Sequence, residues 1–145
     1  QHNYKHKEKI MGLDQYAYAV PEKESESRKE LAYWRKHNRL QGWMEQLWYD
    51  KGRPNAQTDG DAMGDFNCVD LELDANDIDA LEEAIENFAL PETHGFFFGD
   101  DSYLWESEGS PSSANYFHKE EDLRFIEEAK KSLDKGDKVV YHCWY

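Results

Sequence analysis

Two hydrophobic patterns alternate along the chain, and this alternation limits the possible folds more than any other feature of the sequence. Between Leu13 and Val20 every second residue belongs to one face, which is the period of a β-strand, and Pro21 closes the stretch. From Ser27 to Tyr49 the apolar residues recur every three or four positions instead, which predicts a helix. Strand-like and helix-like stretches then continue to alternate to the end of the chain.

The full order is predicted to be β-α-β-α-β-α-β. After the first strand and helix we expect a strand at 66–73, a helix at 75–88, a strand within 94–105, a helix at 119–133 and a strand at 138–145. Asp74 is placed to cap the second helix. Gly42 lies inside the first helix, where glycine costs about 1 kcal/mol relative to alanine, and this suggests close packing against another element. Helices alternating with strands predict a single α+β or α/β domain with a mostly mixed four-stranded sheet packed against helices.

The most apolar run of the chain is HGFFFGDDSYLW, residues 94–105, which has three phenylalanines between two glycines. We expect a buried central strand whose end opens into a loop that carries polar groups. Asp100 and Tyr103 in this loop are candidate ligand-binding residues. Together with Asp101 or Glu106 they are also candidates for acid–base chemistry, which would require a carboxyl with a shifted pKa beside the substrate. The alternative is an acidic surface turn.

A second group of candidate binding residues lies in the first predicted helix. Arg35 and Asn38 are three positions apart and would share a helix face, where a guanidinium and an amide can hold an anion. Trp34 lies beside that face. His37 is interpreted as a hydrogen-bonded histidine at the edge of the core, and the alternative for Trp34 and Arg35 is a core ring and a solvated charge.

No metal or cofactor site is predicted. Residues 59–70 resemble a calcium-binding loop, but Met63 and Asp70 replace two of its ligands and no helix precedes it. Cys68 and Cys143 lack the spacing of a zinc site and are interpreted as small buried thiols in a reducing cytoplasm. Phosphate-binding, dinucleotide-binding and nucleophile-elbow motifs are missing from the sequence.

The formal charge of −14 argues against direct nucleic-acid binding, because an acidic surface repels phosphates. It is compatible with a basic protein partner and with mimicry of a nucleic acid. No apolar run approaches the length of a membrane span, so we expect a cytoplasmic protein without membrane contact. Aromatic residues make up 14% of the chain, which is also compatible with a homo-oligomer.

The first ten residues, QHNYKHKEKI, differ from the rest of the chain. They hold three lysines and one glutamate and contain no Met, whereas Met11 opens an apolar stretch. We expect Met11 to be the native start, residues 1–10 to be a non-native or disordered extension, and residues 11–145 to form the domain.

Several stretches together resemble one family. MGLDQYAYAV, YWRK-x-N, GFFFG and the terminal Tyr-x-x-Trp occur in the same order in small proteins of tailed phages, prophages and some bacterial genomes. The resemblance covers nearly all of residues 11–145 and implies a phage context without an established activity. Its matched polar positions are Arg35, Asn38, Tyr103 and Asp122. Family members commonly have a histidine where this chain has Gln41.

Three functions remain open from the sequence. The leading hypothesis is a non-enzymatic accessory protein that binds a small anionic, nucleotide-like ligand or a host protein and acts in host takeover or anti-defence. The first alternative is an acidic nucleic-acid mimic that inhibits a host DNA-processing protein. The second alternative is a small hydrolase or lyase that uses the acids and the tyrosine of the 94–106 loop.

Overall fold

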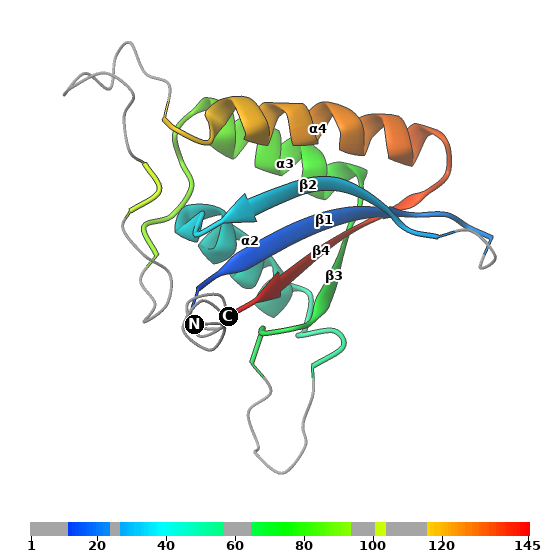
Figure 1. The fold of residues 1–145 in the computed structure, drawn as a ribbon, viewed down its shortest axis with the longest axis horizontal. Coiled ribbons are helices and arrows are strands. Elements are labelled where there is room, and N and C mark those ends of the chain that lie inside the picture. Colours follow the sequence, from blue (N-terminus) through cyan, green and yellow to red (C-terminus); the bar gives the residue numbers. More distant parts are fainter. Residues whose placement is uncertain (1–11, 24–26, 57–64, 94–100, 104–115) are drawn as a thin grey trace, which may run out of the picture.

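Four antiparallel strands form the sheet around which the chain is built (Figure 1). The computed structural model describes residues 12–23, 27–56, 65–93, 101–103 and 116–145. The strands lie in the order β2-β1-β4-β3, and three helices accompany them. This is a single-domain α+β fold, which confirms the predicted fold class. The elements are β1 (Asp14–Val20), β2 (Lys29–Arg35), α2 (Asn38–Asp50), β3 (Asp70–Leu73), α3 (Ala75–Glu86), α4 (Lys119–Asp134) and β4 (Lys138–Trp144).

The sheet is antiparallel at all three pairings instead of mixed. Strands β1 and β2 follow each other as a hairpin, so their directions are opposed. Helices α3 and α4 both lie between β3 and β4 in the sequence and pack against each other. A connection that contains two such helices brings the chain back antiparallel, whereas a single crossover helix would have given a parallel pair.

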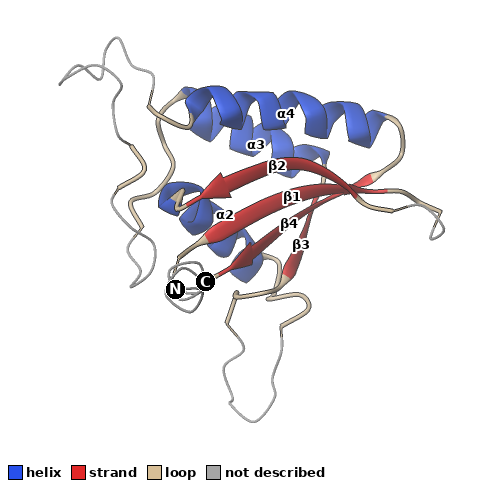
Figure 2. Ribbon diagram, in the orientation of Figure 1, coloured by secondary structure: helices blue, strands red, loops and turns tan. Residues whose placement is uncertain are grey.

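All three helices cover the same face of the sheet (Figure 2). The pairing register places Gln15 between Trp34 and Cys143, so these three side chains point to one face. Trp34 bonds to Asp122 of α4, and Cys143 bonds to Gln41 of α2. The opposite face has no helix in the part of the chain that the structure describes. We call it the open face, and its aromatic residues are Tyr16, Tyr18, Tyr33 and Trp144.

The first predicted helix is wrong in nearly its first half, from Ser27 to His37. Residues 29–35 form the edge strand β2, and α2 begins at Asn38 instead of near Ser27. Pairing with β1 overrides the helical spacing, because a strand that is partly buried against a neighbour accepts the same Leu, Ala, Tyr and Trp residues. Lys36, with a φ of 56°, turns the chain from strand to helix. Arg35 and Asn38 therefore lie on different elements and share no helix face.

The other local predictions agree with the structure more closely. The Asp74 carboxylate accepts from the backbone N–H of Asp77, and the Asp77 carboxylate accepts from that of Asp74, which makes a capping box at the start of α3. The strand predicted at 66–73 is shorter, Asp70–Leu73, and the last strand is β4 in the middle of the sheet. The strand predicted within 94–105 lies outside the described residues, apart from 101–103, which form no strand.

The core between sheet and helices combines aliphatic side chains with several large rings. Gly42 confirms the predicted close approach, because a Cβ atom there would lie 1.9 Å from Oγ1 of Thr93. Cys143 is buried as expected, but Cys68 is exposed, since it precedes β3 in a turn with a φ of 62°. Within the described ranges no helix has the length and apolarity that a bilayer crossing requires. The largest fully buried side chains are those of Trp34, Trp48, Phe66, Tyr116, Phe125 and Tyr141.

Candidate functional site

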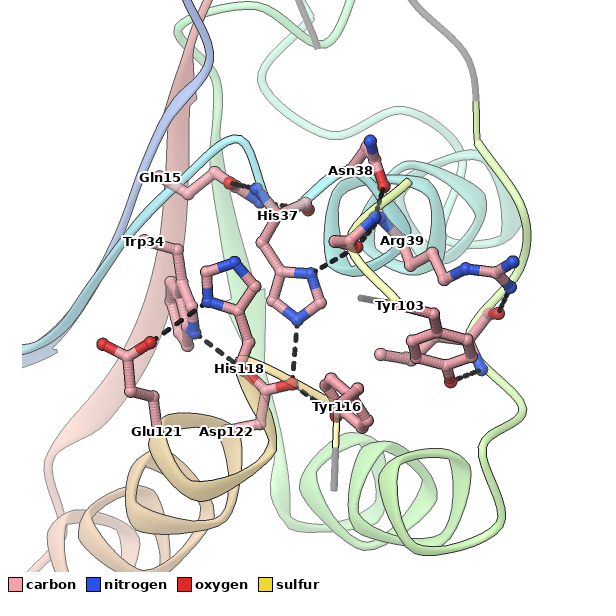
Figure 3. A network of polar contacts seen from close by, with 12 residues as sticks. Gln15, Trp34, His37, Asn38, Arg39, Tyr103, Tyr116, His118, Glu121 and Asp122 are labelled. Atoms are coloured by element: carbon pink, nitrogen blue, oxygen red, sulfur yellow. Dashed lines mark hydrogen bonds and ion pairs between the residues drawn. The ribbon is translucent and has the colours of Figure 1, made fainter. Parts of the chain in front are cut away.

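The carboxylate of Asp122 is the centre of a buried polar network (Figure 3). The residue is 1% exposed and accepts three hydrogen bonds. The indole Nε1 of Trp34 donates to Oδ1 over 2.8 Å, and the Tyr116 hydroxyl donates to Oδ2 over 2.6 Å. Nε2 of His37 is also 2.8 Å from Oδ2. Three donors on one carboxylate compensate the loss of its water shell. We call these four residues the Asp122 network.

The orientation of His37 is fixed on every side. Its backbone exchanges two hydrogen bonds with the side-chain amide of Gln15. Its Nδ1 lies 2.9 Å from Oγ of Ser102, and its Nε2 faces the Asp122 carboxylate. An ionised carboxylate only accepts, so the network assigns a hydrogen to Nε2 of His37. Nδ1 of His37 and the Ser102 hydroxyl are the second hydrogen-bonded pair of this ring.

Ser102, His37 and Asp122 are thus bonded in the order of a serine-hydrolase triad. In the described part of the chain, the surroundings of Ser102 favour a structural role for these three residues. Ser102 is 4% exposed, its Oγ already accepts from the backbone N–H of Arg39, and its own N–H donates to Oδ1 of Asn38. These bonds attach residues 101–103 to the first turn of α2. A nucleophile needs access to substrate, and this hydroxyl has none among the described residues.

His118 connects the buried network with the surface. Its ring stacks on His37 with centroids 4.4 Å apart and planes inclined by 13° (Figure 3). Its Nδ1 pairs with Oε1 of Glu121 at 3.1 Å. Burial, followed by the neighbouring His37, lowers the pKa of His118, while Glu121 acts in the opposite direction. The two stacked rings therefore have a carboxylate at each end, Asp122 beside His37 and Glu121 beside His118.

A pocket of about 420 Å³ opens beside His118, between the edge strand β2 and the first turns of α4. Phe117 is 63% exposed on its wall. Arg35 and Arg124 bring two guanidinium groups, which pair loosely with Asp14 at 3.5 Å and with Glu120 at 3.6 Å. We call this the β2–α4 pocket. Its lining residues are Tyr33, Trp34, Arg35, Phe117, His118, Glu120, Glu121 and Arg124.

The structure separates the residues that the sequence proposed as one site. Trp34 and Arg35 line the β2–α4 pocket. Asn38 is buried and bonds to the backbone of Ser102 instead, and the Tyr103 hydroxyl accepts from the N–H of Leu90 at 3.0 Å. Asp100 lies outside the described residues.

The acidic loop has structural partners where it is described. Asp101 forms two hydrogen bonds with the Arg39 guanidinium, at 2.6 and 2.8 Å. The same guanidinium lies 4.1 Å from the centre of the Tyr103 ring. Gln41, at the position where the resembling family has histidine, is buried, accepts from the Tyr141 hydroxyl and donates to the Cys143 sulfur. These contacts hold α2 in place and bring no acid–base pair to an opening.

Sequence reasoning missed His118, Phe117 and Arg124 altogether. His118 and Phe117 precede α4 without a motif, and Arg124 is an ordinary charged position on an amphipathic helix. Asp122 had a usable signal, because it is spaced with Ile126 and Ala129 on the buried face of α4, where a carboxylate is unexpected.

The described residues include no group of three His, Cys, Asp or Glu side chains arranged to hold a metal ion. Comparison with known proteins adds no relative: no family model, curated protein or solved structure matches the chain. The resemblance to small phage proteins therefore stays a prediction.

Proposed function

We propose that the chain is a binding protein for a small nucleotide-like ligand, one that combines a planar ring with an anionic group, and that the β2–α4 pocket holds it. The observation that carries the proposal is the pocket wall: exposed Phe117 and half-exposed Tyr33 line the same cavity as Arg35 and Arg124. Large apolar rings left open to water beside cations are typical of a surface that a ligand completes.

The size and chemistry of the pocket fit a mononucleotide. Its volume of about 420 Å³ lies within the usual range of about 300–1,000 Å³ for small-molecule sites. The rings offer faces on which a base can stack, and Arg124 offers hydrogen bonds to a phosphate. Glu121 accepts hydrogen bonds, which suits the N–H groups of a base. Glu120 and Glu121 also line the pocket, so an anion would be held by direct bonds to the guanidinium groups and not by a positive potential of the surface.

The wall is held rigidly before any ligand arrives. Trp34 is tied to Asp122, and His118 stacks on the fixed ring of His37. Rigid walls reduce the entropy lost on binding, so a small contact area supports useful affinity. Binding without catalysis is proposed because Asp101, the one acid of the 101–103 segment, is engaged in structural contacts. The phage context implied by the resemblance supports an accessory function in the cytoplasm of an infected bacterium.

Titration calorimetry with the nucleoside monophosphates and with inorganic phosphate tests the proposal. Arg124→Gln should weaken binding of the preferred nucleotide by about tenfold or more, because a charge-assisted hydrogen bond contributes about 1.5–3 kcal/mol. Phe117→Ser should weaken it by about fivefold, the effect of losing a stacked ring worth about 1 kcal/mol.

Two matched controls lie outside the pocket. Lys131→Gln removes a cation from the same helix, and Tyr49→Ser removes a ring that is 51% exposed on α2. Both should leave the affinity unchanged. No heat with any nucleotide from a folded protein would refute the proposal, and so would equal losses in pocket and control variants.

A further inference from the structure

The open face presents an aromatic surface that the proposed pocket leaves unexplained. Tyr16 and Tyr18 of β1 stack with centroids 6.0 Å apart, and Tyr33 of β2 packs 5.2 Å from Tyr16. Tyr33 and Trp144 remain 42% and 41% exposed. An antiparallel sheet commonly leaves one face to solvent, but that face is usually polar, and a group of exposed rings is typical of an interaction surface.

Carboxylates from β2 and β3 lie beside these rings. The register pairs Tyr18 with Glu30, and Tyr16 with His142, which in turn pairs with Asp70. Glu72 lies two residues beyond Asp70 on the same face. The register also puts the cations Arg35 and Lys138 on this face. The part that suits a further cation is therefore the area around Tyr18, where a ring lies beside the carboxylates of Glu30, Asp70 and Glu72, because a ring face and a carboxylate both attract cations.

Arg28 shows how a guanidinium binds to the open face. Its side chain lies 5.0 Å from the centre of the Tyr18 ring and donates to Asp70 at 3.4 Å. It is 44% exposed, so this contact lies at the surface and is open to exchange. An arginine of another protein would find the same ring and the same carboxylate if Arg28 moved aside.

We propose that the open face is a docking surface for an extended, arginine-containing segment of a basic protein. Charge complementarity selects this occupant. Single-stranded nucleic acid also stacks on aromatic sheet faces, but the carboxylates and the net charge of −14 repel its phosphates. A second copy of the chain would bring the same negative charge, which opposes self-association.

The docking surface shares Tyr33 with the β2–α4 pocket, but its other residues allow a separate test. Tyr18, Glu30 and Glu72 do not line that pocket, so variants at these positions test this inference alone. The probe is a fluorescently labelled peptide of alternating Arg and Gly, because in an extended chain all its arginines point to one side. Fluorescence anisotropy with the full chain measures its affinity.

The double variant Glu30→Gln/Glu72→Gln should weaken peptide binding about tenfold, as expected for the loss of charge-assisted contacts. The matched control Glu83→Gln/Glu127→Gln removes two exposed carboxylates from the helix side and should have a small effect. Tyr18→Ser should weaken binding about threefold through the lost ring. Thermal unfolding checks that each variant is folded.

Arg28→Ala gives the sharpest result, because it removes the internal competitor. It should tighten peptide binding about threefold, whereas Lys131→Ala, which changes the net charge equally, should not. Equal weakening by the two glutamate pairs would show general attraction to an acidic protein and would overturn the proposal. Binding of an oligouridine in place of the peptide, or a dimer of the protein alone that Tyr18→Ser dissolves, would overturn it as well.

Discussion

Replacing the Asp122 carboxylate by an amide is the strongest single test of the buried network. Asp122→Asn preserves the shape of the side chain and still lets one oxygen accept from Nε1 of Trp34. The other oxygen becomes an NH₂ group that faces His37 and Tyr116, both of which now donate. His37 must move its hydrogen to Nδ1, and the Tyr116 hydroxyl must accept.

The expected loss of stability follows from the change of three charge-assisted hydrogen bonds into neutral ones. A hydrogen bond to a charged group contributes about 1.5–3 kcal/mol and a neutral one about 0.5–1.5 kcal/mol, so each bond loses about 1 kcal/mol. We expect Asp122→Asn to lower the free energy of unfolding by about 3 kcal/mol. This is a large fraction of the 5–15 kcal/mol that is usual for a domain.

Urea unfolding followed by tryptophan fluorescence measures this difference, since Trp34 and Trp48 are buried in the native state. Tyr116→Phe removes one of the three donors and should lower stability by about 2 kcal/mol. The control Glu127→Gln, an exposed carboxylate on the same helix, should stay within about 0.5 kcal/mol of the parent. If Asp122→Asn unfolds at the same urea concentration as the control, the three bonds do not stabilise the fold and the reasoning fails.

Two further predictions concern single sites. Gly42→Ala should lower the free energy of unfolding, because the new Cβ would lie 1.9 Å from Oγ1 of Thr93, and this outweighs the better helix propensity of alanine, which is about 1 kcal/mol. Adding Thr93→Gly should restore the stability in urea unfolding. A double variant that is as unstable as Gly42→Ala alone would contradict this. Because the pKa of His118 is lowered in the fold, its contribution is fully present above the ordinary value of about 6.5 and is lost as the pH falls below it. The stability difference between the parent and His118→Gln should therefore shrink between pH 8 and pH 5 in thermal unfolding, and a constant difference would refute it.

The parts of the fold that depend on local chemistry were predictable. Asp74 is followed by helical spacing and caps α3, and the stripe that contains Ile126 and Ala129 defines the buried face of α4. Residues 29–35 were not predictable in this way, because apolar residues there fit a helix stripe as well as a strand. Only pairing with β1, which joins Tyr33 to Tyr16 and Trp34 to Gln15, decides between the two.

The candidate site was less predictable because it is built from distant segments. The bond from Trp34 to Asp122 spans 88 positions, and that from His37 to Ser102 spans 65. No local pattern encodes such distances. What the sequence does contain is a polar residue in an apolar position, as at Asp122, and this signals a buried partner without saying which one.

The buried carboxylate has a consequence that apolar packing would not have. Hydrophobic contacts fix where a ring lies, but a hydrogen bond also fixes how it is turned. The bond from Trp34 to Asp122 sets which edge of the indole faces the β2–α4 pocket, and the bond from His37 sets the plane on which His118 stacks. Two walls of the pocket thus take their orientation from one residue that does not line it. If the Asp122 network served only to join β2 to α4, apolar side chains could fill the same space at similar stability. The orientation of the pocket walls is therefore the physical reason to connect the Asp122 network with binding.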